Sequence, residues 1–110
     1  MEFQRLSERA LEIRQQYADL ERARCGRSWT GQELALGFVG DVGDLMKLVQ
    51  AASGVRDIPD ARARLAHELA DCLWSVLVLA DAYGIDVERA FFDTMDELEQ
   101  RLSTQGLAES

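Results

Sequence analysis

Two pairs of acidic residues are the part of this 110-residue sequence that is best able to do chemistry. Asp41 and Asp44 lie in the stretch Gly-Asp-Val-Gly-Asp-Leu, and Glu68 and Asp71 lie in Glu-Leu-Ala-Asp. On a helix, residues three apart in sequence share a face and are separated by about one turn. Each pair therefore offers two carboxylates side by side. Ligands that are all oxygen favour Mg²⁺ or Mn²⁺ over zinc.

The acidic pairs fall in or beside the apolar faces of their helices. On a helical wheel, Asp41 lies inside one apolar stripe, Asp44 lies on its flank, and Glu68 lies at the edge of a second stripe. A carboxylate beside a core is destabilising unless another charge neutralises it. The chain has one lysine, and its nearby arginines are at helix ends. We therefore predict that a divalent cation binds the four acids; a solvated helix face is the alternative.

The spacing of apolar residues predicts an all-α protein with helices over about residues 3–24, 31–53, 61–83 and 87–103. Thr30 followed by Glu33 is typical of a capping box at the start of the second helix. Asp60 and Asp86 are the expected N-caps of the third and fourth helices, and Gly54 suits the position after the second. The residues expected in the core are Leu34, Phe38, Leu45, Val49 and Ala52 on the second helix, Leu65, Leu69, Cys72, Leu73, Val76 and Ala80 on the third, and Val87, Phe91, Met95, Leu98 and Leu102 on the fourth.

The third predicted helix is apolar on almost all sides from Cys72 onward. A helix that is apolar all round is buried all round, and one chain of this length has too few helices to enclose it. We therefore predict a homo-oligomer whose interface covers Trp74, Leu77 and Val78. We expect a single domain over residues 1–110, with a frayed tail over residues 104–110.

The overall charge limits which partners the chain is expected to bind. The formal net charge is −8, which argues against binding of a nucleic-acid polymer or of an anionic membrane surface. No apolar run approaches the length of about 20 residues that spans a bilayer, and the polar, charged opening of the chain does not suggest a signal peptide. Cys25, Cys72 and a single histidine do not form a zinc or disulfide pattern, so reduced thiols and a cytoplasmic location are expected.

Three stretches together resemble the MazG family of all-α nucleoside triphosphate pyrophosphohydrolases. They are LALGFVGDVGDL (residues 34–45), ELADCL (residues 68–73) and LADAYGID (residues 79–86), and the resemblance covers roughly residues 30–95. The family signature is ExxE on one helix and ExxD on the next. By resemblance, Asp41, Asp44, Glu68 and Asp71 are the Mg²⁺ ligands. Glu68, the longest of these side chains, is the candidate catalytic residue that orients or deprotonates the attacking water.

The resemblance implies a four-helix bundle-like protomer that forms a homodimer or homotetramer. It implies Mg²⁺-dependent hydrolysis of a nucleoside or deoxynucleoside triphosphate to a monophosphate and pyrophosphate, with Mn²⁺ as an alternative metal. Two features depart from the family pattern. The first acidic pair is Asp-Asp where the family has Glu-Glu, and Thr94 and Leu98 occupy the positions of a lysine and an asparagine. These departures favour the alternative function, a non-catalytic MazG-like oligomer that binds metal, nucleotide or a partner protein.

Several residues near the acids have two interpretations each. Trp29 precedes the second helix and is a candidate to stack on a base, or to form a hydrophobic staple. Lys47 is a candidate to reach a phosphate, although an ion pair with Asp44 is the interpretation we favour. Arg62 and Arg64 could guide a triphosphate or could simply be exposed charges, and we expect His67 to be a surface residue.

Three glycines, Gly37, Gly40 and Gly43, interrupt the second predicted helix, although glycine in a helix interior destabilises it by about 1 kcal/mol relative to alanine. Gly37 and Gly40 share a flank with Asp44. They either allow a neighbouring helix to pack closely or leave space for a ligand.

Overall fold

The computed structural model describes residues 2–109, which form four helices joined by short loops. They are α1 (Glu2–Cys25), α2 (Gly31–Ala52), α3 (Ala61–Ala82) and α4 (Val87–Glu109). The predicted all-α class is confirmed. Helix α4 continues to Glu109, beyond Ser103 where we expected fraying to begin, and Ser110 lies outside the described residues.

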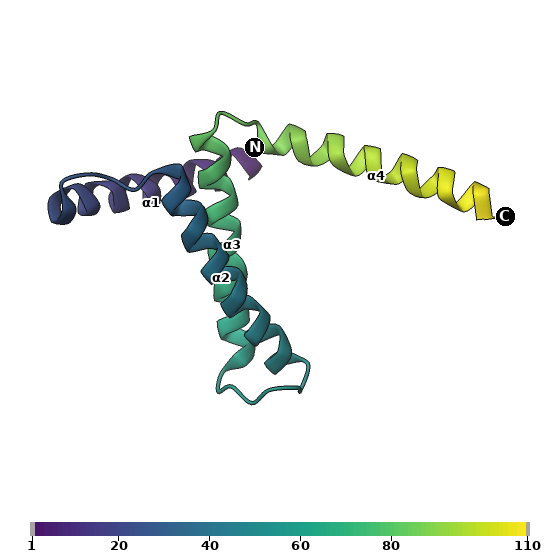
Figure 1. Cartoon of the computed structure of the whole chain (residues 1–110), viewed down its shortest axis with the longest axis horizontal. Helices are drawn as coiled ribbons and strands as arrows, with labels where there is room; N and C mark the ends of the chain where they lie inside the picture. Colours follow the sequence, from purple (N-terminus) through teal and green to yellow (C-terminus); the bar gives the residue numbers. More distant parts are fainter. Residues whose placement is uncertain (1, 110) are drawn as a thin grey trace.

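Helices α2 and α3 lie side by side and antiparallel, and they form the body of the chain (Figure 1). Helix α1 crosses one end of this hairpin and packs on α3. Helix α4 projects away from the body beyond the end of α3. Among the described residues, none of the four helices is long and apolar enough to cross a membrane.

The start of α2 is fixed by the predicted capping box. The hydroxyl of Thr30 accepts a hydrogen bond from the Glu33 amide at 3.2 Å, and the Glu33 carboxylate accepts one from the Thr30 amide at 3.0 Å. Arg27 also donates to Glu33 at 2.7 Å, and this bond is the main reason that the pKa of Glu33 falls to about 2. These bonds join the loop before α2 to its first turn.

The other predicted helix ends are mostly confirmed. The Asp86 carboxylate accepts a hydrogen bond from the Arg89 amide at 3.1 Å, as expected of an N-cap, and Gly54 has a φ of 81° just after α2. The expected cap at Asp60 is wrong. Asp60 does precede α3, but its backbone is left-handed with φ at 54°, and its side chain makes no capping hydrogen bond.

The predicted oligomer interface is also wrong in its residues. Leu77 and Val78 are only 7% and 3% exposed within the chain, and the Trp74 indole donates a hydrogen bond to the Ala10 carbonyl at 3.0 Å. Trp74 also lies against Tyr17, with ring centroids 5.8 Å apart. Helices α1 and α2 cover the side of α3 that we expected a second chain to cover.

The apolar residues left uncovered are different ones. Leu69, Leu73 and Val76 of α3 and Val49 of α2 were expected in the core but are exposed, whereas Leu48 is buried. Leu34, Phe38 and Leu45 of α2 are not exposed, so the main disagreement with the predicted stripes lies on α3. On α4, Phe91, Met95, Leu98 and Leu102 were also expected to face the core and are exposed.

We expect Thr30→Ala to destabilise the protein by about 1 kcal/mol, since it leaves the Glu33 amide without its capping acceptor. Thr30→Ser keeps the hydroxyl and is the matched control, which should unfold close to the wild-type temperature. Thermal unfolding followed by circular dichroism measures both. Equal losses in the two variants would contradict the assignment of the effect to the cap.

Candidate metal centre

Three of the four predicted metal ligands converge between α2 and α3. Asp41 and Asp44 of α2 and Glu68 of α3 each offer a carboxylate oxygen, and these oxygens all lie within 4.8 Å of one another. Asp71 lies outside this group, and its carboxylate pairs with the Nε2 atom of His67 at 3.2 Å. His67 is a surface residue, as expected.

The carboxylates of the cluster are close to each other, and those of Asp41 and Glu68 are partly buried whereas that of Asp44 is exposed. Burial is the main cause that raises the pKa of Glu68, and the charges of Asp41, Asp71 and Asp44 raise it further. Burial is likewise the first cause of the raised pKa of Asp41, followed by the charges of Asp71 and Asp44. Asp71 thus acts on the cluster electrostatically although its oxygens lie outside it.

One oxygen of the cluster has no partner. The Oε1 atom of Glu68 is buried and makes no hydrogen bond to any described residue. A buried carboxylate oxygen without a donor is unfavourable, and neighbouring negative charges add to its instability. An all-oxygen donor set with an orphaned buried oxygen fits a divalent cation of the Mg²⁺ or Mn²⁺ type.

The nearest lysine does little to neutralise the acids. Lys47 Nζ lies 4.0 Å from Asp44, and both side chains are more than half exposed. The favoured ion pair therefore forms, but exposed pairs of this kind contribute about 1 kcal/mol or less. Lys47 is left able to reorient toward another anion.

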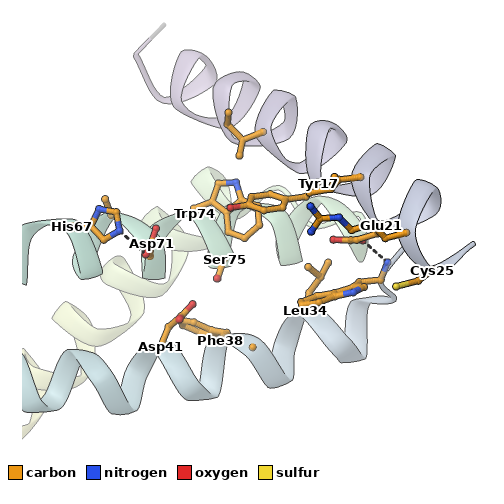
Figure 2. Close-up of a pocket in the computed structure, with 16 residues that line it drawn as sticks. Tyr17, Glu21, Cys25, Leu34, Phe38, Asp41, His67, Asp71, Trp74 and Ser75 are labelled. Atoms are coloured by element: carbon orange, nitrogen blue, oxygen red, sulfur yellow. Dashed lines mark hydrogen bonds and ion pairs between the residues drawn. The ribbon is translucent and has the colours of Figure 1, made fainter. Parts of the chain in front are cut away.

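A pocket of about 800 Å³ opens between α1, α2 and α3 beside the acids (Figure 2). Its lining is mainly apolar and aromatic, and we call it the aromatic pocket. Asp41 and Asp71 lie at one end of it, where Asp41 points from α2 toward α3. Its other lining residues are Ile13, Tyr17, Leu20, Glu21, Arg24, Cys25, Trp29, Leu34, Gly37, Phe38, His67, Ala70, Trp74 and Ser75.

Trp29 is fixed in the wall of the aromatic pocket by two residues of α1 that the sequence analysis did not identify. Glu21 accepts a hydrogen bond from the Trp29 amide at 2.7 Å, and Arg14 donates one to the Trp29 carbonyl at 2.8 Å. Arg14 and Glu21 also pair with each other at 3.2 Å, with side chains only 16% and 11% exposed. Their spacing of two helical turns on one face of α1 was the only available signal.

Three of the four glycines of α2 do not serve close helix packing within the chain. A Cβ atom added at Gly37, Gly40 or Gly43 would meet no atom of a neighbouring element within 4 Å. Gly37 instead lines the aromatic pocket, where the missing side chain leaves room for a ligand. Thr94 and Leu98 are on α4, which projects away from α2 and α3 (Figure 1).

The sequence comparisons identify the class of protein to which this site belongs. The family model described as the MazG nucleotide pyrophosphohydrolase domain matches residues 30–104, and the chain is a member of this family. Among curated proteins, dCTP pyrophosphatase 1 of Rattus norvegicus is similar, at 37% identity over 75 residues. That match covers 64% of this chain and 44% of the relative, so the chain spans less than half the length of the relative. No solved structure gives a significant match.

The family match contains both acidic pairs and leaves α1 outside it. The shared part of the molecule is therefore the α2–α3 hairpin that carries the acids, together with most of α4. Arg14 and Glu21, which hold Trp29, belong to the unmatched part.

In metal-free protein, we expect Glu68→Gln to raise the melting temperature at pH 7 by a few degrees, on the scale of about 1 kcal/mol or less. The raised pKa means that folding favours the protonated carboxyl. Glu68 therefore stabilises the fold at pH values below the pKa of its carboxyl in the unfolded chain, about 4. This contribution is lost as the pH rises through the higher pKa of the folded protein. The advantage of Glu68→Gln should therefore vanish near pH 3.

Thermal unfolding in excess chelator at both pH values checks this expectation. Glu99→Gln, at an exposed position of α4, is the matched control and should change little at either pH. A Glu68→Gln protein that is less stable than wild type at pH 7 without metal would contradict the unfavourable burial and repulsion of the Glu68 charge in the cluster.

Proposed function

We propose that the protein is a Mg²⁺-dependent pyrophosphohydrolase that converts a nucleoside or deoxynucleoside triphosphate to its monophosphate and pyrophosphate. The observation that carries this proposal is the convergence of Asp41, Asp44 and Glu68 on one point between α2 and α3. Membership of the MazG family and similarity to a dCTP pyrophosphatase support the same reaction. Mg²⁺ is the proposed metal, and Mn²⁺ has the same ligand preference.

In this reaction the protein chiefly positions the reactants and stabilises charge. A bound divalent cation supplies charge neutralisation of the triphosphate and acidifies a water. Asp41, Asp44 and Glu68 would hold the cation, and Asp71, which pairs with His67 here, would be the fourth ligand. Glu68 orients the attacking water and accepts its proton while the water oxygen bonds to the α-phosphorus. The bond from that phosphorus to the bridging oxygen then breaks, and the departing pyrophosphate takes the electron pair.

The aromatic pocket is the proposed site for the nucleoside. It adjoins Asp41 and Asp71 and is lined by two tryptophans, a tyrosine and a phenylalanine, and flat aromatic rings bind bases by stacking. Trp29 is 47% exposed, so its side chain is open to a ligand. Arg14 and Glu21 hold the Trp29 backbone and thereby position the ring.

Self-association into a homodimer or homotetramer is part of the proposal. Phe91, Met95, Leu98 and Leu102 of α4 repeat every three or four residues and are all exposed, which is the spacing of a helix–helix interface. Helix α4 lies away from the rest of its own chain (Figure 1). A second copy offers a surface of matching character at Leu69, Leu73 and Val76 of α3.

A second candidate function is non-catalytic binding of metal and nucleotide. It is favoured by the position of α4, because Thr94 and Leu98 bring no cation or amide to the phosphates. Incubation of the protein with a panel of nucleotides and Mg²⁺ separates the two functions, since only the enzyme releases pyrophosphate.

We expect Glu68→Gln and Asp44→Asn each to reduce pyrophosphate release by on the order of a hundredfold or more, the scale for loss of a group that stabilises transition-state charge. Asp96→Asn, an acid of α4 outside the cluster, is the control and should retain activity. Coupled pyrophosphate detection with Mg²⁺ measures the rates, and circular dichroism checks the fold. Full activity in both cluster variants would exclude the proposed site.

Leu98→Asp should shift the protein toward monomer, because it places a charge in the apolar stripe of α4. Gln100→Asp adds the same charge on the opposite side of α4 and should leave the assembly intact. Sedimentation velocity over a range of protein concentrations distinguishes the two. A wild-type protein that is monomeric at every concentration would remove self-association from the proposal.

A further inference from the structure

A second pocket adjoins the acid cluster on the side opposite the aromatic pocket. It has a volume of about 510 Å³, and three basic side chains line it, Lys47 of α2 and Arg64 and His67 of α3. We call it the basic pocket. Asp44 and Glu68 form its wall toward the acid cluster.

The two pockets follow one another along the antiparallel hairpin. On α2, the aromatic pocket is lined by residues within 34–41 and the basic pocket by residues within 44–48. On α3, the aromatic pocket takes residues 67–75 and the basic pocket takes residues 63–68. The carboxylate cluster lies at the boundary on both helices, so a ligand centred on the metal would extend into both pockets.

We propose that the basic pocket binds the pyrophosphate end of the substrate, the β- and γ-phosphates, and retains pyrophosphate after cleavage. This inference rests on the proposed function, and it adds the direction in which the substrate lies. The nucleoside occupies the aromatic pocket, the α-phosphate lies at the carboxylates, and the leaving group points toward Lys47 and Arg64. From Asp41 to Lys47 the α2 axis advances by about 9 Å. The ammonium group of Lys47 therefore lies beyond the proposed metal ligands along α2.

The charges around the basic pocket support an anionic ligand that arrives together with a metal. Lys47 Nζ is 4.0 Å from Asp44 in a weak, exposed pair, and Arg64 makes no ion pair with any described carboxylate. His67 pairs with the carboxylate of Asp71. Without metal, Asp44 and Glu68 repel phosphate. With metal bound, their charge is offset and the basic side chains dominate.

The start of α3 adds a favourable dipole. Ala63 and Arg64 belong to the first turn of α3 and line the basic pocket. The residue before the helix, Asp60, has a left-handed backbone and makes no side-chain capping bond. The amide of Arg64 donates to the Asp60 carbonyl at 3.0 Å, whereas the amide of Ala63 has no side-chain cap and keeps its capacity to donate to an anion. The basic pocket supplies phosphate-binding groups from the α2–α3 hairpin, where α4 supplies none.

Calorimetric titration of full-length protein with pyrophosphate, in saturating Mg²⁺, tests the proposal. Arg64→Met and Lys47→Met should each weaken pyrophosphate binding about tenfold, the lower end for a lost hydrogen bond to a charged group. Arg62→Met is the control, because Arg62 lies on the same turn but outside the basic pocket, and it should bind as wild type does. Titration with Mg²⁺ alone verifies that each variant still binds metal.

The direction of the substrate is tested with the monophosphate of the nucleotide that wild-type protein cleaves fastest. Arg64→Met should bind this monophosphate within twofold of wild type, while Trp29→Ala should lose about tenfold for the monophosphate and little for pyrophosphate. The proposal is overturned if wild type does not bind pyrophosphate with Mg²⁺, or if Arg64→Met weakens both ligands equally. Failure of the proposed function gives a different result from failure of this inference. In that case no nucleotide of the panel yields pyrophosphate, whatever the binding measurements show.

Discussion

The placement of three carboxylates within 4.8 Å of one another between α2 and α3 is the constraint on which the rest of the molecule depends. At an effective dielectric constant of 20, each fully ionised pair at this separation repels by at least about 3 kcal/mol. The fold tolerates this only by protonation, by partial exposure to water, or by a bound cation. The hairpin therefore has to be stabilised elsewhere, through the capping box of α2 and the packing of α3 against α1.

The antiparallel hairpin gives the acid cluster two different surroundings. Toward one end, α1 lies over the hairpin and closes a pocket of aromatic side chains. Toward the other end, the pocket beside the acids is lined by Lys47, Arg64 and His67. The chemical asymmetry follows from the position of α1 on one side of the acid cluster and from the basic residues Lys47 and Arg64 on the other. The unmatched N-terminal helix thus defines one half of the site, and the family-matched hairpin defines the other.

Local rules predicted the parts of the structure that local interactions determine. The capping box at Thr30 and Glu33 and the cap at Asp86 involve residues within one helical turn, and the structure has them as expected. Of the two acidic pairs, Asp41, Asp44 and Glu68 come together, whereas Asp71 pairs with His67 outside the cluster. The predicted core stripes failed at Leu69, Leu73 and Val76, because the rotation of a helix depends on partners distant in sequence. The hydrogen bonds of Arg14 and Glu21 with the Trp29 backbone were not predicted, for the same reason. It joins a helix to a loop through backbone atoms, which sequence patterns do not report.

The attachment of α1 is narrow, and this has a dynamic consequence. Its contacts with α3 centre on Trp74, whose indole donates a hydrogen bond to the Ala10 carbonyl and packs against the Tyr17 ring. A helix held along so short a strip can separate from the hairpin at a lower free energy than the hairpin needs to unfold. Amide protons of α1 are then exchanged with solvent in openings that leave α2 and α3 intact. Such openings expose the indole of Trp74 and widen the entrance for a bulky aromatic molecule.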